Sequence, residues 1–140
     1  MADAKMLRRE RMRQRFAKLP TAMRADVGAQ LKTEVDDLVA AQRRAAPVDK
    51  TAKEPGQFRD SIHAYPNPDR ELSFRIIADA KDENGDPIGG KIEHGHRARD
   101  GTHVAAVPSF FPTYRARKKG MKRRVAAAGR KSVKRLFPSE

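Results

Sequence analysis

The sequence predicts an α+β fold with a long N-terminal helix, a small antiparallel β-sheet of three to four strands and a basic C-terminal helix. Three observations lead to this prediction. Apolar residues recur every three or four positions from Met23 to Gln42, as on one face of a helix. They alternate with polar residues across Leu72–Ala78, as in a half-buried strand. The segment from Thr113 onward combines helical periodicity with many Lys and Arg residues.

The length and charge of the chain limit the number of domains and the kind of partner that it can bind. The chain has 140 residues, of which 35% are charged and 38% are hydrophobic, and its net charge is +13. We assign residues 1–20 to a basic arm or helix and residues 21–140 to a single domain. The charge favours a polyanion, an acidic protein surface or an acidic neighbouring subunit as the partner, and it does not rank these three.

Two absences narrow the classes of function. The sequence contains no cysteine, which excludes disulfides, thiolate metal sites and cysteine nucleophiles. It also contains no stretch of about 18 consecutive apolar residues, which a membrane-spanning helix would need. We therefore expect a soluble chain without a membrane partner.

The first helix is the most strongly patterned element. Residues 5–18 are basic and loosely amphipathic, and Pro20 is expected to interrupt them, with Thr21 as the cap of a new helix. The helix should end before Pro47, because the residue that precedes a proline avoids the helical region. Its apolar stripe consists of Met23, Val27, Leu31, Val35, Leu38 and Gln42.

The middle of the chain predicts an exposed loop and a hairpin. Residues 47–56 are polar and rich in helix-breaking residues, and Phe58 and Ile62 are spaced for one helical turn. The alternation over Ile62–Tyr65 predicts a first strand. The turn sequence Pro66-Asn67-Pro68-Asp69 separates it from the more strongly patterned strand Leu72–Ala78.

Two further strands are predicted with less support from the pattern. Ile88–Ile92 is expected to form a third strand that is weak or bulged, because it contains Gly89 and Gly90. His103–Val107 is expected to form a fourth strand at an edge, where Pro108 ends the hydrogen bonding.

The last helix is predicted to begin at a cap provided by Ser109 or Thr113, and Gly120 and Gly129 should weaken it. Its apolar face is expected to consist of Tyr114, Met121, Val125, Ala128, Ser132 or Val133, and Leu136. The residues expected to contact DNA or an acidic surface are Arg115, Arg117, Lys118, Lys119, Lys122, Arg123 and Arg124.

Metal-binding and catalytic patterns are incomplete. Asp82, Asn84, Asp86 and Glu93 have the spacing of a calcium loop, but Pro87 occupies the position of the turn glycine. His94 and His96 are two apart, with His63 and His103 elsewhere, and no second spaced pair completes a zinc site. Because no nucleophile elbow or phosphate loop is present either, we expect no cofactor, no metal and no enzymatic activity. A metal hydrolase that uses His94, His96 and Glu93 remains the minor alternative.

Four short motifs occur in an order that resembles a known family. They are Ala46-Pro47-Val48-Asp49, Phe58-Arg59-Asp60-Ser61-Ile62, Ile92-Glu93-His94-Gly95 and Val107-Pro108-Ser109-Phe110-Phe111-Pro112. Over about residues 23–137 the chain resembles the gene-product-ten-like neck family of long-tailed bacteriophages and phage-like particles, which are head–tail joining or tail-completion proteins. The chain departs from the family pattern at Lys50, at Phe58 in place of leucine and at His96 in place of threonine.

The resemblance implies a non-enzymatic structural protein of the virion, assembled in the cytoplasm of the bacterial host. Its subunits would form a ring, expected to be a hexamer, between the head connector or stopper and the tail tube, with DNA passing through the lumen. Whether it is a neck protein or a tail terminator stays open. The residues that the resemblance assigns to subunit or ring contacts are Arg59, Asp60, Glu93, Gly95, Arg97, Arg99, Phe110 and Phe111. The alternative is a sequence-independent nucleic-acid-binding protein that acts through its basic terminal segments.

Overall fold

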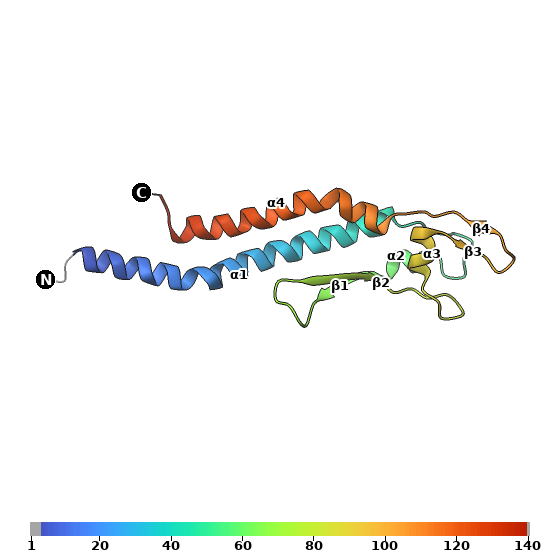
Figure 1. The fold of residues 1–140 in the computed structure, drawn as a ribbon, viewed down its shortest axis with the longest axis horizontal. Helices are drawn as coiled ribbons and strands as arrows, with labels where there is room; N and C mark the ends of the chain where they lie inside the picture. The colour runs from blue at the N-terminus through green and yellow to red at the C-terminus, as the bar shows by residue number, and fades with distance from the viewer. Residues whose placement is uncertain (1–3, 140) are drawn as a thin grey trace. The chain divides into compact units, whose positions relative to one another are not determined.

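The computed structural model describes residues 4–139 and contains four helices and four short strands within them (Figure 1). In chain order the elements are α1 (Ala4–Ala45), α2 (Gln57–Asp60), β1 (Ile62–Pro66), β2 (Phe74–Ala78), α3 (Ile88–His94), β3 (His96–Arg97), β4 (His103–Val104) and α4 (Phe110–Leu136). The α+β class, the long N-terminal helix and the basic C-terminal helix are confirmed. None of the helices within residues 4–139 combines the length and the apolar character needed to cross a lipid bilayer.

The described residues form two compact units. The helical unit comprises the described residues up to Thr33 together with those from Gly120 onward, and the mixed unit is Glu34–Lys119. Both long helices therefore contribute residues to each unit. All strands and both short helices belong to the mixed unit.

The helix α1 continues through Pro20, so the predicted break there, with Thr21 as a new cap, is wrong. A proline inside a helix removes a backbone hydrogen bond and costs about 3 kcal/mol. Tertiary contacts exist on both sides of it. Phe16 packs on Phe137 with ring centroids 4.7 Å apart, and Met23 packs against Gly129. Helices in proteins derive most of their stability from such packing, which here maintains α1 across Pro20.

In the helical unit, α1 and α4 run antiparallel side by side (Figure 1). Gly129 of α4 is buried, and a Cβ atom there would lie 3.4 Å from Met23 Cε and 3.6 Å from Val27 Cγ2. The glycine that was expected to weaken α4 thus provides the space for the side chains of α1.

A polar contact accompanies this packing. Ser132 of α4 is fully buried and donates a hydrogen bond to Asp26 of α1, and Arg135 forms an ion pair with Asp26 at 2.9 Å. The Ser132 hydroxyl, with help from Arg135, lowers the pKa of Asp26. Of the two residues predicted for this position of the apolar face, Ser132 is the buried one, whereas Val133 is exposed.

The core of the mixed unit joins segments that are far apart in the sequence. Its buried cluster is Ala46, Phe58 and Ile62. The half-buried apolar residues packed on this cluster are Val39, Ile76, Ala78, Ile88, Ile92 and Phe110. The end of α1 adds buried Val35, Leu38 and Gln42, so the predicted stripe is buried at this end of the helix.

The first two predicted strands are confirmed as an antiparallel hairpin, in which Ile62 pairs with Ala78 and Pro66 with Phe74. Leu72 lies outside the hairpin. It is exposed and has a positive φ of 55°, so the second strand begins two residues later than predicted. The strands β3 and β4 form a separate two-stranded sheet. The described residues therefore contain two small sheets in place of the predicted single sheet of three to four strands.

The predicted third strand is wrong, because Ile88–His94 forms the helix α3. Ile88 and Ile92 are four apart, so a helix turns both toward the same core cluster. Gly89 lets α3 approach closely, since a Cβ atom there would lie 3.4 Å from Phe58 and 3.5 Å from the carbonyl oxygen of Ala78. The two glycines, interpreted as a strand bulge, instead belong to a helix packed on its neighbours.

The predicted fourth strand is confirmed only at its first two residues, His103 and Val104. Beyond them the chain leaves the sheet, and the N–H of Val107 donates to the carbonyl oxygen of Ile92 at 2.8 Å. This bond is made to α3, which explains why the pairing with β3 is so short.

Candidate interaction site

The start of α4 is held by the carboxylate of Glu93. Its Oε2 accepts hydrogen bonds from the N–H groups of Ser109 at 2.9 Å and Phe110 at 3.1 Å, and its Oε1 accepts one from Phe111 at 3.1 Å. The first N–H groups of a helix have no partner within the helix and carry its positive dipole end. Glu93 therefore caps α4 from another helix, in place of the local caps predicted from Ser109 or Thr113.

The cap is a buried charge. Glu93 is only 7% exposed. Burial opposes its ionisation, but the three backbone N–H donors more than offset this effect, and the pKa of the carboxyl is lowered from its usual value. The carboxylate thus stays ionised at neutral pH and supplies a negative charge where the helix dipole favours one.

Gly95 allows the chain to turn away from α3 directly after the cap. Its φ is +73°, in the region that only glycine adopts readily. A Cβ atom on this residue would lie 2.7 Å from the carbonyl oxygen of Val104 and 3.0 Å from the N of Ala106. Both the backbone angle and the close passage of residues 104–106 therefore require glycine, which accounts for the spacing Glu93-x-Gly95.

The two phenylalanines at the start of α4 have different environments. Phe110 packs on the core cluster, and its carbonyl oxygen accepts a hydrogen bond from Nε2 of Gln42 at 3.1 Å. Phe111 is 48% exposed and contacts Phe110 edge to face, with ring centroids 5.2 Å apart. Phe110 is a structural anchor of α4, and Phe111 is an apolar group on the surface.

Gln42 was not identified from the sequence as part of this site. It is 1% exposed on α1, and it fastens α1 to the first residue of α4. Its neighbour Arg43 donates from Nε to the carbonyl oxygen of Ile62 at 2.8 Å, at the start of β1. The available signal was a polar residue at the last position of an otherwise apolar stripe, because such a residue needs a buried partner.

Each of the four sequence motifs contributes to the same core. Ala46 comes from the first motif, Phe58 and Ile62 from the second, Ile92 from the third and Phe110 from the fourth, and all belong to one packed cluster. The four motifs, which are far apart in the chain, therefore meet in one packed core. We call this region, centred on Glu93 and Phe110, the junction.

An apolar groove of about 330 Å³ adjoins the junction within the mixed unit. One side is formed by Ile76–Ala78 of β2, another by Gly89 and Gly90 of α3, and the third by the two phenylalanines of α4. Glu93 and His94 complete the lining together with Phe58. Because the exposed ring of Phe111 borders it, the groove presents apolar surface to a possible neighbour.

Four predicted contact residues lie outside the junction. Arg59 donates from Nε to Oδ1 of Asp60 at 2.9 Å, and this hydrogen bond lowers the pKa of Asp60. Arg97 is exposed in β3, and Arg99 is exposed in the turn that follows it. The structure brings Glu93, Gly95, Phe110 and Phe111 together and leaves these four as charged groups at other points of the mixed unit.

The acidic residues with the spacing of a calcium loop form a hydrogen-bonded turn around Asp82. Asp82 accepts hydrogen bonds from the N–H groups of Asn84 and Asp86, and from Nζ of Lys91 at 2.8 Å. The bond from Lys91, followed by the backbone N–H of Asp86, lowers the pKa of Asp82 to about 2. Glu93, the last member of the pattern, is directed toward α4. Within residues 4–139 no three His, Asp or Glu side chains are grouped closely enough to hold a metal ion.

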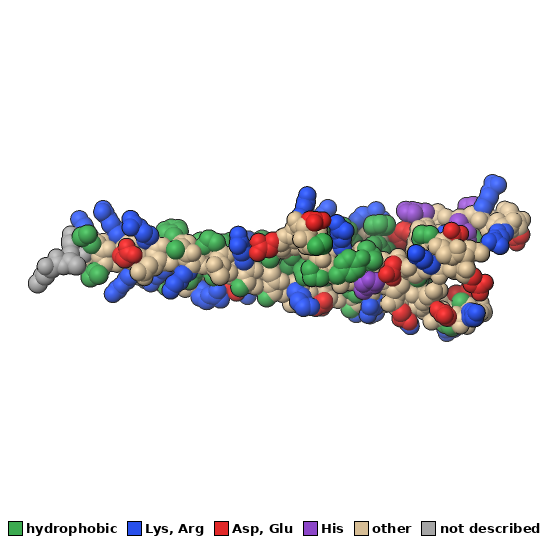
Figure 2. All heavy atoms as spheres, turned by 90° about the horizontal axis from the view of Figure 1, so that it is seen from below, with side chains coloured by type: hydrophobic (Ala, Val, Ile, Leu, Met, Phe, Trp, Pro, Cys, Tyr) green, Lys and Arg blue, Asp and Glu red, His purple; other side chains and the backbone are tan. Residues whose placement is uncertain are grey.

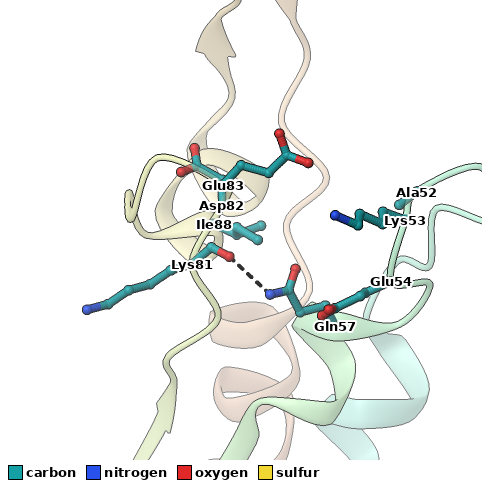
Figure 3. A pocket seen from close by; sticks show the side chains of 8 residues that line it. All are labelled: Ala52, Lys53, Glu54, Gln57, Lys81, Asp82, Glu83 and Ile88. Carbon is teal, nitrogen blue, oxygen red and sulfur yellow. Dashed lines mark hydrogen bonds between the residues drawn. The ribbon is translucent and has the colours of Figure 1, made fainter.

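A second cavity, of about 400 Å³, lies beside this turn (Figure 3). Asp82 and Glu83 line one side of it and Lys53 and Glu54 the other, and the amide of Gln57 donates to the carbonyl oxygen of Lys81 at 3.0 Å. The lining is mixed in charge, and nothing in it resembles a set of catalytic groups.

The basic residues of α4 fall in both units. Arg115, Arg117, Lys118 and Lys119 belong to the mixed unit, and Lys122, Arg123 and Arg124 belong to the helical unit. Arg117 is half-buried, and the other six are exposed. Nζ of Lys118 lies 5.8 Å from the centre of the Tyr114 ring, which is within the range of a cation–π contact.

Charge is divided very unequally between the two units. The sequence segments 1–33 and 120–140 contain sixteen Lys or Arg against four Asp or Glu, a net charge of +12, whereas residues 34–119 contain fifteen against fourteen, a net charge of +1. Figure 2 shows Lys and Arg side chains along the helical segments, with few acidic side chains among them. Nearly all of the excess charge of the protein therefore belongs to the helical unit.

Comparison of the chain with protein-family models, with curated proteins and with solved structures found no match. What the protein does must therefore be argued from its motifs, its junction and its charge.

We expect Glu93→Gln to lower the free energy of unfolding by about 2 kcal/mol at pH 7, because an amide places an N–H donor against the N–H groups of α4. Because the pKa of Glu93 is lowered in the folded state, the contribution of this residue to the free energy of unfolding depends on pH. The difference in unfolding free energy between the variant and the wild type should be largest above the ordinary glutamate pKa of about 4.5. It should shrink as the pH falls below that value. Urea unfolding between pH 7 and pH 3 measures this. The matched control is Glu83→Gln on an exposed turn residue, and an equal loss in both variants would contradict the cap.

Gly95→Ala and Gly90→Ala should have opposite effects. The first introduces a Cβ atom into the backbone of residues 104–106 at a positive φ, and we expect a loss of at least about 2 kcal/mol. The second adds a methyl group within α3 where no atom lies within 4 Å, and we expect a gain of about 0.5–1 kcal/mol. Thermal unfolding followed by circular dichroism measures both effects. An unchanged stability of Gly95→Ala would contradict the close passage of residues 104–106 beside Gly95.

Proposed function

We propose that this chain is a structural subunit of the neck of a long-tailed bacteriophage or a phage-like particle. In this proposal it has no enzymatic role, and copies of it form a ring, a hexamer, between the head connector or stopper and the tail tube. DNA passes through the ring. The role is head–tail joining, either as a tail-completion neck protein or as a tail terminator.

The observation that carries the proposal is the convergence of the four family-like motifs on one core. Short motifs occur by chance, but here each contributes to a single cluster of Ala46, Phe58, Ile62, Ile92 and Phe110. A shared packing arrangement is a reason for such motifs to occur together and in order. This convergence supports the proposal, of which the likeness of fold and the function are both part.

The groove beside Phe111 supports assembly into a ring. It combines apolar lining from β2, α3 and α4 with an exposed aromatic ring at its border. A contact in which this groove receives a different face of the next copy is heterologous, and repetition of such a contact closes a ring when the rotation permits it. We therefore assign the groove to the neighbouring subunit.

The ring can be tested on the purified chain with and without its tail-tube partner. We expect light scattering to give about six times the 15.7 kDa of the chain. Phe111→Ser should abolish the ring and leave the circular dichroism spectrum unchanged, because the side chain is about half exposed. The matched control is Leu72→Ser, which removes a similarly exposed apolar side chain that does not line the groove. A monomer under both conditions would contradict the ring.

The role in head–tail joining has its own readout. Electron microscopy of particles assembled without this chain should reveal separate heads and tails or malformed tail ends. Normally joined particles would overturn the proposal, whatever the oligomeric state of the purified protein.

A second candidate function is sequence-independent binding of nucleic acid, and the division of charge favours it. The helical unit carries +12 of the total of +13, and exposed Lys122 and Arg123 lie on it. Contact with a phosphate backbone needs only such charge and reads no sequence. The two functions are compatible, because a ring through which DNA passes meets the same backbone.

Binding of this kind must depend on salt. We expect the affinity for a labelled DNA duplex to fall steeply between about 50 and 200 mM salt. Lys122→Gln combined with Arg123→Gln should reduce the slope of log K against log salt by about two, one for each lost phosphate contact. Lys50→Gln combined with Lys53→Gln, in an exposed loop of the mixed unit, is the control and should leave the slope unchanged. An affinity that does not respond to salt would exclude this function.

A further inference from the structure

The helical unit contains a groove that neither proposed function uses. Its volume is about 650 Å³, and it lies between the first turns of α1 and the chain that follows α4. Arg8, Arg11 and Arg15 line it from α1, and Leu7 and Met12 lie among them. Phe137 and Pro138 line it from the C-terminal segment. We call it the arginine groove.

The three arginines form a row. They are three and four residues apart, which places them on one side of α1. With a rise of 1.5 Å per residue, their positions along the helix are about 4.5 and 6 Å apart. Carboxylates four residues apart on a second helix would meet Arg11 and Arg15, because that helix has the same rise.

The walls of the groove are apolar. Leu7 is 52% exposed and Met12 is 39% exposed, which is a large exposure for side chains of this kind. Phe137 is held in position by the ring of Phe16, at 4.7 Å between centroids. A partner that covers the groove must therefore bring apolar side chains as well as anionic groups.

Two kinds of occupant fit these observations poorly. The helical unit of a second copy carries the same net charge of +12 and would be repelled. The helix α2, with four residues, is too short to cover a row that spans two turns of α1, and α3 already packs on the core of the mixed unit through Ile88 and Ile92. A nucleic-acid backbone matches the charge but offers no apolar side chain to Leu7 and Met12.

We infer that the arginine groove binds an amphipathic helix of another protein, one whose apolar face is bordered by Asp or Glu at a spacing of four residues. This inference goes beyond the neck proposal and does not depend on it. Arg11 and Arg15 pair with the carboxylates, and Leu7, Met12 and Phe137 receive the apolar face.

The test uses the full chain and a synthetic helical peptide of about 18 residues, with Glu opposite the arginine row and Leu on the adjoining face. Fluorescence anisotropy of the labelled peptide measures its affinity. We expect Arg11→Glu combined with Arg15→Glu to weaken binding at least about tenfold. The matched control is Lys131→Glu combined with Lys134→Glu, which makes the same change of charge on exposed residues of α4 outside the groove, and we expect less than about a threefold effect. Circular dichroism spectra of both variants verify that the helices are retained.

Two further probes decide the chemistry of the partner. A peptide with the same glutamates but with Ser in place of Leu should bind at least about tenfold more weakly, because the apolar walls then have no partner. Equal binding of the two peptides, or equal loss in the groove and control variants, would overturn the inference in favour of charge alone. Tighter binding of a DNA duplex or of anionic phospholipid vesicles than of the peptide, lost only in the groove variant, would overturn it in favour of that partner.

Discussion

The buried carboxylate of Glu93 is the contact on which the mixed unit depends. It comes from the end of α3 and accepts the first N–H groups of α4, so a charge on one element fixes the start of another. Gln42 fastens the same end of α4 to α1. Gly95 then allows the chain to turn after α3 and leaves room for residues 104–106 to pass close by. Because a buried charge without partners is strongly unfavourable, the cap and the packing around it must form together.

The division of charge gives the two units different tasks. The mixed unit is almost neutral, and its apolar core and groove suit contacts between protein subunits. The helical unit carries nearly all the excess charge and little buried apolar surface, so its outer faces suit anionic partners. The proposed neck role would use both, with the mixed unit toward ring neighbours and the helical unit toward DNA or acidic proteins. The arginine groove extends this reasoning to a partner that offers acid and apolar groups at once.

Where the sequence prediction failed, a tertiary contact outweighed a local rule. Pro20 was expected to end a helix, but packing of Phe16 and Met23 on either side maintains α1. Ile88–Ile92 was expected to be a strand that its glycines weaken or bulge, but a helix places both isoleucines on the core. Glu93, Gly95, Phe110 and Phe111 were among the eight residues predicted for subunit contacts and lie together in the junction, whereas Gln42 was not among them. Its role depends on a partner 68 residues away, which periodicity does not reveal.

The sequence by itself determined the α+β class, the apolar stripe of α1, the existence of the hairpin β1–β2 and the basic character of α4, because these depend on periodicity and composition within short windows. Only the tertiary structure decided that the four strands form two separate sheets and that Glu93 is a helix cap. It also decided that nearly all the charge falls in one compact unit. The physical reason is that a hydrogen bond, a close glycine contact or a groove is made by residues distant in the chain, and their meeting is set by the packing of the whole core.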